Sequence, residues 1–469
     1  MTPAPPIKNH FFDFAPETLR AWCEAPPRRW PGFKADQILE WVYKKRVIDP
    51  MAMTTLSKLE RETLAREVVF LSGRVVREQA ASDGTRKLLV EWDGGTKGRR
   101  DEGGGATQRR SDGENSNGTE QRSDEGANGL SLTVLLPTAG TNGESPVDRD
   151  RRPTQSIDPR IDRDGRSTQS LNQTTAGPQT ECVMIPSLDP SGPRRTACIS
   201  SQVGCPVGCK FCASGLGGFE ANLSAGRIVE QVWLLGTPTL RGGAGPNHPG
   251  SSESQSNGAL EEPPRRGGVP TAGRITNVVF MGMGEPLANL PNVVRAVRTI
   301  AALWGLGISA RKITISTVGL PKAIEKLAQQ LELPVTLALS LHAPNDDLRR
   351  TLIPWAEYTT IADLLAACRK WFEKTGREIT LEYTLLRGIN DKPEHAVELA
   401  QVAKSLRANV NLIRYNEVAG LDFKRPRDED VREFQRLLVT RNVNTHIRRS
   451  RGRDIAAACG QLRHETAKA

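Results

Sequence analysis

The chain has few aromatic residues and no long apolar run. Aromatic side chains make up 5% and hydrophobic ones 37% of the 469 residues, which is low for one compact domain of this length. No apolar run approaches the roughly 18 residues that a membrane-spanning helix needs. Residues 1–13 lack the apolar core and small-residue cleavage site of a secretory signal. These absences argue against a membrane or secreted protein, and we expect a cytoplasmic protein that does not associate with membranes.

Two segments, 94–178 and 237–273, account for the missing apolar residues. Neither contains Phe, Trp, Tyr or Cys, and together they hold 22 of the 43 glycines. We predict that both are low-complexity, disordered insertions at surface connections, where extra length costs little closure entropy. The other 347 residues contain 49 basic and 38 acidic side chains. The positive charge therefore belongs to the foldable part of the chain and favours a polyanionic partner.

Residues 1–72 have helical periodicity and are predicted to form a small helical accessory domain. The segment 33–43 places its apolar side chains near one face, and a second helix is expected to begin near Thr54. This pattern alone favours a plain helical domain over one that docks nucleic acid. Residues 73–93 and 179–195 contain short strand patterns and are predicted to form a linking β-hairpin. The first insertion then separates the two hairpin partners.

Residues 196–462 alternate between strand and helix patterns, and 463–469 form a tail. Strand patterns occur at 197–200, 275–281, 312–316, 335–341, 378–385 and 410–414, and helix patterns at 227–235, 293–303, 321–330, 361–372 and 396–406. Six strands that alternate with helices indicate parallel βα units of the α/β class, in an open sheet or a partial barrel. In such folds the chemistry gathers at the carboxyl ends of the strands.

Cys205, Cys209 and Cys212 lie in a loop with Gly and Pro after the first predicted strand. Their CxxxCxxC spacing lets the backbone turn three thiols toward one point, where soft thiolates can hold zinc or an iron–sulfur cluster. A structural zinc site needs a fourth Cys or His at paired spacing, and none lies nearby. Three thiolates on a four-iron cluster leave one iron open to a small molecule. That arrangement suits the reductive cleavage of S-adenosylmethionine, which we favour over zinc.

Small polar residues follow the other predicted strands. The turn Met-Gly-Met-Gly-Glu-Pro at 281–286 exposes carbonyl groups and a carboxylate, which suits the ammonium group of a ligand, although Gly-Glu-Pro is also an ordinary turn. Ser316, the Ser-Leu-His run at 340–342 and Asn416 follow the third, fourth and sixth strands. These residues can face a ligand or simply cap a helix.

The remaining cysteines are far apart in the chain and do not form the pattern of a disulfide framework. Cys459 has small neighbours, which leave a thiol accessible, and the arginines before it favour the thiolate. Cys198 lies on the first strand, in the core or at the barrel mouth. Cys23 and Cys368 have apolar neighbours on helical segments and are expected to be structural. Cys182 is given no role.

Together these motifs resemble the RlmN family of radical-SAM RNA methyltransferases. The resemblance is carried by the cysteine cluster, Ser-Ser-Gln-Val-Gly-Cys at 200–205, the turn at 281–286, Ser-Leu-His-Ala-Pro-Asn at 340–345 and Ala-Cys-Gly-Gln-Leu at 458–462. It extends from about residue 33 to 462 and is interrupted only by the two low-complexity segments. It implies a partial (βα)6 radical-SAM barrel and one [4Fe-4S] cluster on Cys205, Cys209 and Cys212. The residues implied to hold S-adenosylmethionine are Gly284, Glu285, Ser316, Ser340, Leu341, His342 and Asn416.

The resemblance also implies a reaction. Family members methylate C2 of an adenine in 23S rRNA, and many modify the adenine beside the anticodon of some tRNAs. Two S-adenosylmethionine molecules are used per turnover: Cys459 takes a methyl group from the first, and a radical derived from the second activates that methyl group for addition to adenine. Cys198 matches the family's resolving thiol, which forms a disulfide with Cys459 and releases the RNA. Glu181 matches the family's proposed general base or acid.

The expected partners are 23S rRNA, tRNA and an electron donor such as flavodoxin or ferredoxin, and the chain is expected to be a monomer. RNA phosphates are expected to contact basic residues of the C-terminal quarter, namely Arg414, Lys424, Arg425, Arg427, Arg448, Arg449, Arg451 and Arg453. Two alternatives stay open. One is a Cfr-like enzyme that methylates C8 of the same rRNA adenine, and the other is a non-catalytic iron–sulfur or zinc protein that only binds RNA.

Overall fold

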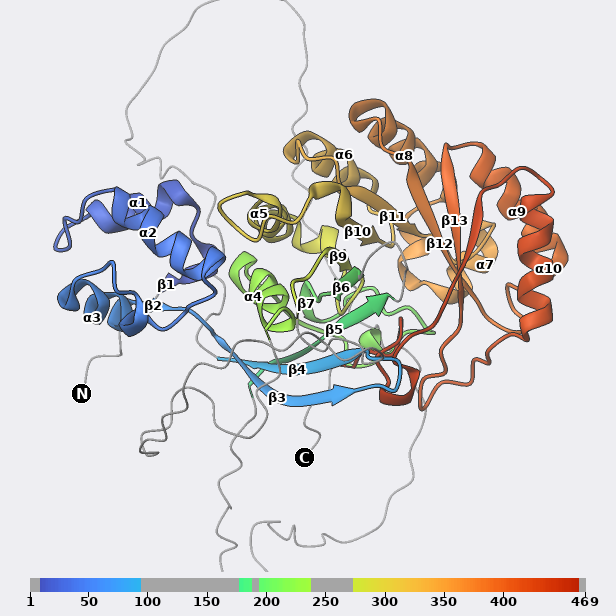
Figure 1. Ribbon diagram of the computed structural model, residues 1–469. Coiled ribbons are helices and arrows are strands. Elements are labelled where there is room, and N and C mark those ends of the chain that lie inside the picture. Colours follow the sequence, from blue (N-terminus) through green and yellow to red (C-terminus); the bar gives the residue numbers. More distant parts are fainter. Residues whose placement is uncertain (1–8, 94–176, 188–193, 238–272, 464–469) are drawn as a thin grey trace, which may run out of the picture. The chain divides into compact units, whose positions relative to one another are not determined.

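A computed structural model describes residues 9–93, 177–187, 194–237 and 273–463 (Figure 1). The predicted insertions 94–178 and 237–273 lie outside the described residues, apart from their ends at Gly177, Pro178, Thr237 and Gly273. The predicted tail 463–469 also lies outside them, apart from Arg463.

A ten-stranded sheet forms the centre of the described structure. Its strands are β3 (Gly73–Ala80), β4 (Arg86–Trp92), β5 (Gln179–Ser187), β6 (Arg194–Cys198), β9 (Asn277–Phe280), β10 (Ile313–Thr317), β11 (Thr336–Ser340), β12 (Ile379–Leu385), β13 (Ala408–Arg414) and β14 (Thr445–Arg448). The spatial order is β14-β13-β12-β11-β10-β9-β6-β5-β4-β3. The strands from β14 to β6 are parallel, and β5, β4 and β3 extend the sheet in antiparallel fashion. The predicted α/β fold with parallel βα units is confirmed.

One parallel strand, β14, is not among the strands that the sequence predicts. Its four residues read Thr-His-Ile-Arg, and Thr445 is the one fully buried residue among them. Such a short, polar segment carries no apolar run and no clear alternation, so sequence periodicity does not reveal it. It joins the sheet through parallel pairing with β13. The resulting strand end places Arg448 at the sheet edge where the site lies.

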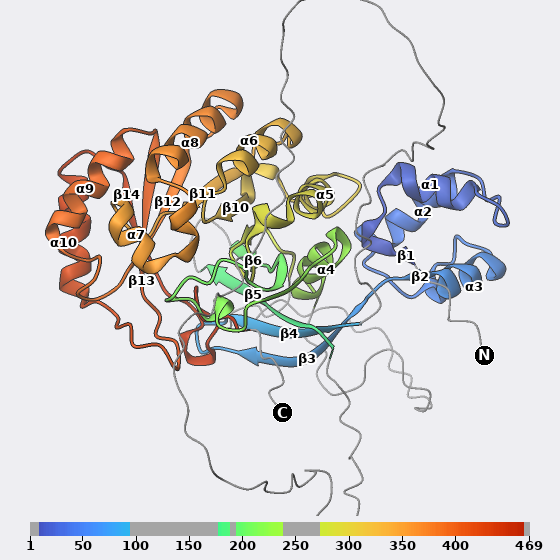
Figure 2. The same cartoon turned by 180° about the vertical axis from the view of Figure 1, so that it is seen from behind.

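Helices connect the parallel strands: α4 (Ala225–Leu235), α5 (Leu290–Ala301), α6 (Pro321–Gln330), α7 (Asp346–Leu352), α8 (Ile361–Thr375), α9 (Pro393–Lys404) and α10 (Asp428–Val439). Figures 1 and 2 show α5, α6, α8, α9 and α10 following one another along the outer side of the sheet. Each is amphipathic: α5, for example, buries Val293, Val297 and Ile300 at i, i+4 and i+7. The helices thus cover one face of the sheet, and the carboxyl ends of the strands are left for the site.

The N-terminal region contains α1 (Pro16–Glu24), α2 (Phe33–Leu39) with a π-helical turn at Glu40–Lys44, and α3 (Lys58–Glu67). The second predicted helix begins later than Thr54 because Ser57 caps α3, accepting from the Glu60 backbone N–H. Short strands β1 (Asn9–His10) and β2 (Val68–Val69) pair in parallel beside these helices. His10 Nε2 lies 2.8 Å from Glu230 of α4, which links this region to the sheet-covering helices.

In the segments 73–93 and 179–195, β4 and β5 pair antiparallel with Leu89 opposite Glu181. The residues that flank the first insertion lie at one end of this strand pair, where the Trp92 N–H donates to the Pro178 carbonyl at 2.8 Å. At the other end, the turn between β3 and β4 holds the C-terminal segment. Ser82 N–H donates to Asp454, and Gly452 N–H donates to Asp83. The hairpin therefore anchors the stretch of chain that carries Cys459.

Candidate active site

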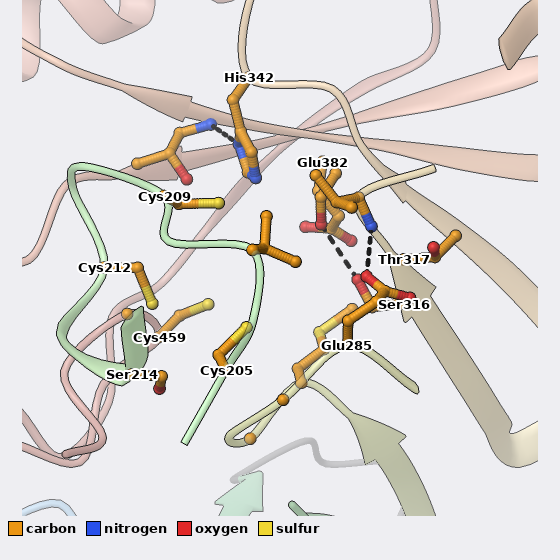
Figure 3. A pocket seen from close by; sticks show the side chains of 18 of the residues that line it. Cys205, Cys209, Cys212, Ser214, Glu285, Ser316, Thr317, His342, Glu382 and Cys459 are labelled. Atoms are coloured by element: carbon orange, nitrogen blue, oxygen red, sulfur yellow. Dashed lines mark hydrogen bonds between the residues drawn. The ribbon is translucent and has the colours of Figure 1, made fainter. Parts of the chain in front are cut away.

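A pocket opens at the carboxyl ends of β9 to β13. Figure 3 shows the cysteine loop on one side of this pocket and Glu285, Ser316 and Glu382 opposite it. Of the residues that the sequence singles out, most line the pocket: Cys205, Cys209, Cys212, Gly284, Glu285, Ser316, Ser340, His342 and Cys459. This position is the one that parallel βα folds use for ligands.

The cysteine loop connects the two strands of a short hairpin, β7 (Gln202–Gly204) and β8 (Phe219–Asn222). Gly204 has a φ of 73°, and a Cβ there would collide with the carbonyl oxygen of Gly218, so the close approach of these strands requires glycine. Cys212 N–H donates to the Cys209 carbonyl at 3.1 Å and tightens the bend. The loop is thereby shaped before any cofactor binds.

The three thiols line the same pocket. Burial raises the pKa of the Cys205 thiol to about 12, and burial together with the charges of Cys212 and Cys205 raises that of Cys209. The pKa of Cys212 is also raised, mainly by burial. Neutral thiols become thiolates when a metal centre compensates their charge.

The donor set fits an iron–sulfur cluster better than a single ion. The described residues contain no group of three His, Cys, Asp or Glu side chains arranged to hold one metal ion. A zinc ion draws its sulfur ligands to about 2.3 Å from one point. A four-iron cluster instead takes each thiolate on a different iron, so the ligands stay further apart. Cys205, Cys209 and Cys212 would hold such a cluster, and the pocket beside them leaves room for a ligand of its open iron.

The Gly-Glu-Pro turn after β9 is tied to the cysteine hairpin. Gly284 has a φ of 101°, and a Cβ there would lie 2.6 Å from the Gln202 Cβ. The Glu285 carboxylate accepts from the N–H groups of Leu287 and Val318, at 2.9 and 2.8 Å. Burial raises the pKa of Glu285 against these hydrogen bonds. Glu285 thus fixes the turn of β9 to the end of β10 as well as lining the pocket.

Ser316 and Ser340 end neighbouring strands, and their hydroxyl oxygens lie 3.2 Å apart. His342 follows with a φ of 58°, and its Nδ1 accepts from the Thr384 N–H at 3.0 Å. Burial, assisted by the charge of Arg349, lowers the pKa of His342 to about 3. The imidazole is therefore neutral and can serve as a positioned hydrogen-bonding group.

Two predicted ligand residues do not line the pocket. Leu341 is fully buried, and its carbonyl accepts from the Arg349 Nε at 3.3 Å. Asn416 is 2% exposed, and its amide group donates to the Cys459 carbonyl at 3.1 Å. In this arrangement Asn416 holds the Cys459 segment and Leu341 shapes the floor of the site.

Cys198 lies near the segment that carries Cys459, although 260 residues separate the two cysteines in the chain. Cys198 is buried at the end of β6, packed with Met283, Ala457 and Leu462. Cys459 lines the pocket with an exposed side chain. The charge of each thiol acts on Arg448, and that of Cys459 acts on Cys198. Both thiols are free.

The positive charge of Arg448 favours the thiolate of Cys459, as the sequence predicts for the arginines before it, but desolvation is the larger influence and the pKa of Cys459 is raised. Burial likewise raises the pKa of Cys198 to about 12. The arginines near Cys459 in the sequence thus do not make it a stable thiolate, because most of them point elsewhere.

Glu181 lies on β5, outside the set of pocket-lining residues. Its carboxylate forms an ion pair of 2.7 Å with Lys87 and accepts from the Arg463 N–H at 2.8 Å. Lys87 also donates to the Ala456 carbonyl at 3.3 Å. These contacts place Glu181 directly against the segment that carries Cys459.

Sequence reasoning misses Glu382, Lys87 and the position of Arg448. Glu382 is 4% exposed, lines the pocket and accepts from Asn411 at 2.8 Å. The sequence feature that could have identified Glu382 is an acidic residue inside a strand that is predicted to be buried. Arg448, one of the residues expected to contact RNA, is half-buried, donates to the Met281 sulfur at 3.3 Å and interacts with the charge of Glu382. It lies beside these pocket residues because β14 ends at Arg448.

The other C-terminal arginines gather in a separate hollow of about 910 Å³. Five arginines and two aspartates line it, together with Ser450: Arg414, Arg425, Arg449, Arg451, Arg453, Asp83 and Asp428. Asp428 pairs with Arg414, and Asp83 lies 3.8 Å from Arg451. The hollow therefore keeps an excess of positive charge. Lys424 and Arg427 do not line it, and Arg427 is paired with Asp430.

Comparison with known proteins identifies relatives of the whole chain. Residues 269–400 match the Radical SAM superfamily, and residues 10–70 match the Ribosomal RNA large subunit methyltransferase N-terminal domain. A Gloeobacter violaceus protein described as "Probable dual-specificity RNA methyltransferase RlmN" is 35% identical over 96% of this chain and 94% of its own length. A Thermosynechococcus vestitus protein of the same description is 45% identical over 61% of this chain and 74% of its own.

A solved structure agrees with the sequence relatives. The crystal structure of a radical SAM methyltransferase from Sphaerobacter thermophilus is similar with a TM-score of 0.69 and 31% identity, over 97% of this chain and all of that one. Within the described residues, no helix is long and apolar enough to cross a membrane. The relatives, the fold and the cysteine loop at the pocket agree, and the chain belongs to the RlmN family of radical-SAM RNA methyltransferases.

Proposed function

We propose that the chain methylates C2 of a specific adenine in 23S rRNA, and of the adenine beside the anticodon in some tRNAs. Its relatives are described as dual-specificity RNA methyltransferases, and the radical SAM family implies a [4Fe-4S] cluster and S-adenosylmethionine. The observation that supports the proposal is that Cys459 lines the pocket beside the cysteine loop and lies near enough to the buried Cys198 for its charge to act on that thiol.

The cofactors have defined places in this proposal. Cys205, Cys209 and Cys212 hold the cluster, and the pocket between them and the strand ends holds S-adenosylmethionine. Ser316, Ser340, His342 and the 281–286 turn are the polar groups available to it. Bound together, the cluster and S-adenosylmethionine supply the one-electron chemistry that activates an unreactive C–H bond. An electron donor such as flavodoxin or ferredoxin provides the electron, and the chain acts as a monomer.

Cys459 acts as the methyl carrier. Its sulfur would attack the methyl carbon of one S-adenosylmethionine, so that a new sulfur–carbon bond forms, the sulfonium–methyl bond breaks, S-adenosylhomocysteine leaves and the thiol gives up its proton. A second S-adenosylmethionine is consumed when that methyl group is activated and joined to adenine C2. Two molecules are therefore used per turnover.

Cys198 and Glu181 resolve the resulting protein–RNA adduct. The Cys198 sulfur attacks the Cys459 sulfur, an S–S bond forms, and the bond from Cys459 to the methylene carbon breaks with its electron pair going to the RNA product, which takes up a proton. A cellular thiol must then reduce the disulfide. Glu181 exchanges the proton at this stage, held in place by Lys87 and close to the Cys459 segment.

RNA enters over the basic hollow. Arg449, Arg451 and Arg453 lie in the same C-terminal segment as Cys459, so phosphates held there lead the chain of RNA toward the pocket. The pocket lies at the strand ends, so its target base must be unstacked to reach Cys459. A single-stranded loop or a distorted stem meets that requirement.

Nucleoside analysis by mass spectrometry tests the proposal. The comparison is between 23S rRNA and tRNA from cells that lack the protein and from cells that regain it. We expect 2-methyladenosine to disappear from both RNAs and to return with the wild-type chain but not with Cys459→Ala. If 8-methyladenosine were the sole product, the Cfr-like alternative would hold. If Cys459→Ala restored the modification in full, the carrier role would be wrong.

A second test separates the enzyme from a metal protein that only binds RNA. After anaerobic reconstitution we expect a brown, oxygen-sensitive protein with about four irons per chain. A colourless, zinc-loaded preparation with full activity would contradict the cluster assignment.

A further inference from the structure

Arg349 is a buried arginine beneath the site that neither the sequence motifs nor the proposed reaction uses. It lies on α7 with 1% of its surface exposed. Its guanidinium group donates to two backbone carbonyls, that of Val318 at 2.6 Å and that of Leu341 at 3.3 Å. Val318 follows β10 and Leu341 follows β11. Arg349 therefore joins the ends of two strands under the pocket.

The charge of Arg349 has no paired carboxylate within the described ranges of the chain. Its hydrogen-bond partners are carbonyl oxygens, and none of the ion pairs there includes it. Asp346 acts on it only as a nearby charge, and an Asp346 carboxylate oxygen is engaged by the Ile361 N–H. Burying a charge without a countercharge is costly. Burial accordingly lowers the pKa of Arg349 to about 10, which still leaves it charged at neutral pH.

The negative partner available to Arg349 is the cysteine loop. α7 packs against this loop: the Lys210 N–H donates to the Leu352 carbonyl at 3.0 Å, and Leu352 and Ile353 pack with Val207 and Phe211. Val318, whose carbonyl accepts from Arg349, packs in the same apolar cluster as Leu352 and Ile353, and Cys209 packs against this cluster.

We propose that Arg349 is the built-in countercharge of the thiolate-held cluster, and that it raises the reduction potential of the cluster. The inference rests on the assignment of the cluster to Cys205, Cys209 and Cys212. A fixed positive charge stabilises the more negative state of a redox centre, which is the reduced one. Arg349 is thus a positioning residue: it touches neither RNA nor S-adenosylmethionine, and it acts through the cluster and the two strand ends.

The test is a redox titration of the reconstituted full chain, followed by electron paramagnetic resonance, without S-adenosylmethionine or RNA. Arg349→Gln keeps donors for the carbonyls but removes the charge. We expect it to shift the reduction equilibrium at least tenfold toward the oxidised state, which is about 59 mV for a one-electron couple. Arg349→Lys keeps the charge and is expected to stay within threefold of wild type.

Arg227→Gln is the matched control. Arg227 is also buried, at 9% exposed, and also donates to a backbone carbonyl, that of Asp93 at 2.7 Å, but it lies on α4 and does not line the pocket. Its loss should leave the potential unchanged. A wild-type potential in Arg349→Gln, or an equal shift in Arg349→Lys and Arg349→Gln, would overturn the proposal.

Iron and sulfide content keeps the test decisive if a variant loses its cluster. Loss in Arg349→Gln with retention in Arg349→Lys supports the role of the charge. Loss in both shows that the two carbonyl contacts matter rather than the charge, and the proposal then fails. A wrong cluster assignment would give a different result. The wild-type chain would then not bind about four irons, or Cys209→Ser would leave its cluster unchanged.

Discussion

Lys87 and Glu181 form an ion pair of 2.7 Å across β4 and β5, and the same ammonium group donates to the Ala456 carbonyl. The two side chains are only 7% and 10% exposed. The pair thus connects the proposed proton-transfer group to the segment that carries the methyl-carrying thiol. Neither residue's partner could be read from the sequence, because their contact depends on antiparallel register across an insertion.

Breaking this pair should destabilise the fold more than removing it whole. Lys87→Met leaves Glu181 buried without its countercharge, and we expect a loss of about 3–5 kcal/mol in the free energy of unfolding. Lys87→Met combined with Glu181→Met should recover most of that loss. Urea unfolding of the two variants and wild type measures the difference. Equal losses in the single and double variants would show that the pair contributes little.

Cys198→Ala should trap the RNA. Without the second thiol, the adduct on Cys459 has no partner for disulfide formation, so we expect a covalent protein–RNA species and at least a hundredfold slower product release. Denaturing gel electrophoresis with labelled RNA detects it. Cys182→Ala is the matched control, because Cys182 is also buried and lies on the neighbouring strand β5 within charge-interaction range of Cys198. An adduct in the control, or none in Cys198→Ala, would refute the resolving role.

The basic hollow should control how RNA binding depends on salt. Arg449→Met and Arg453→Met are each expected to weaken RNA binding and to reduce the slope of log affinity against log salt by about 1. Arg436→Met, an exposed arginine on α10 that is paired with Glu433, should change neither. Filter binding at several salt concentrations measures both quantities. If all three variants behaved alike, the hollow would not be the phosphate-binding surface.

The stability of the cofactor-free chain should fall in mild acid because of His342. Its folded pKa is about 3 against an ordinary value of 6.5. Below pH 6.5 the unfolded chain takes up a proton that folded His342 refuses, so the unfolding free energy decreases by about 1.4 kcal/mol per pH unit toward pH 3. His342→Gln should lack this contribution. Chemical unfolding at pH 7, 6 and 5 compares the slopes, and identical slopes would contradict the buried, neutral imidazole.

The sequence predicts the parallel βα core well, because its buried strands are apolar runs bounded by turn residues. Helix α6 begins and ends where its apolar spacing does, at Pro321 and Gln330. β14 escapes prediction because its pairing with β13, and not its composition, makes it a strand. Element type thus follows from local pattern, whereas edge strands depend on tertiary contacts.

The site shows the same division. Cys205, Cys209 and Cys212 are visible as a spacing, because one loop brings them together. Arg448 and Arg349 are invisible as site residues, because their surroundings come from strand ends and a helix far apart in the chain. The arginines at 448–453 suggest a single basic surface from the sequence, but Arg448 at the end of β14 lies beside the pocket residues and Arg449 lines the hollow. The position of each arginine relative to the end of β14 decides this difference, and the composition of the segment does not.

The hydrogen bond from the Trp92 N–H to the Pro178 carbonyl joins, within the central sheet, the two chain ends that flank residues 94–176. The pairing of β4 with β5 continues up to this hydrogen bond, so the register of the two strands does not depend on residues 94–176. Whatever is spliced in between can lengthen, shorten or be exchanged without shifting Glu181 relative to Lys87. Sequence of a different length can therefore be accommodated between residues 93 and 177 during evolution without moving Lys87 away from Glu181.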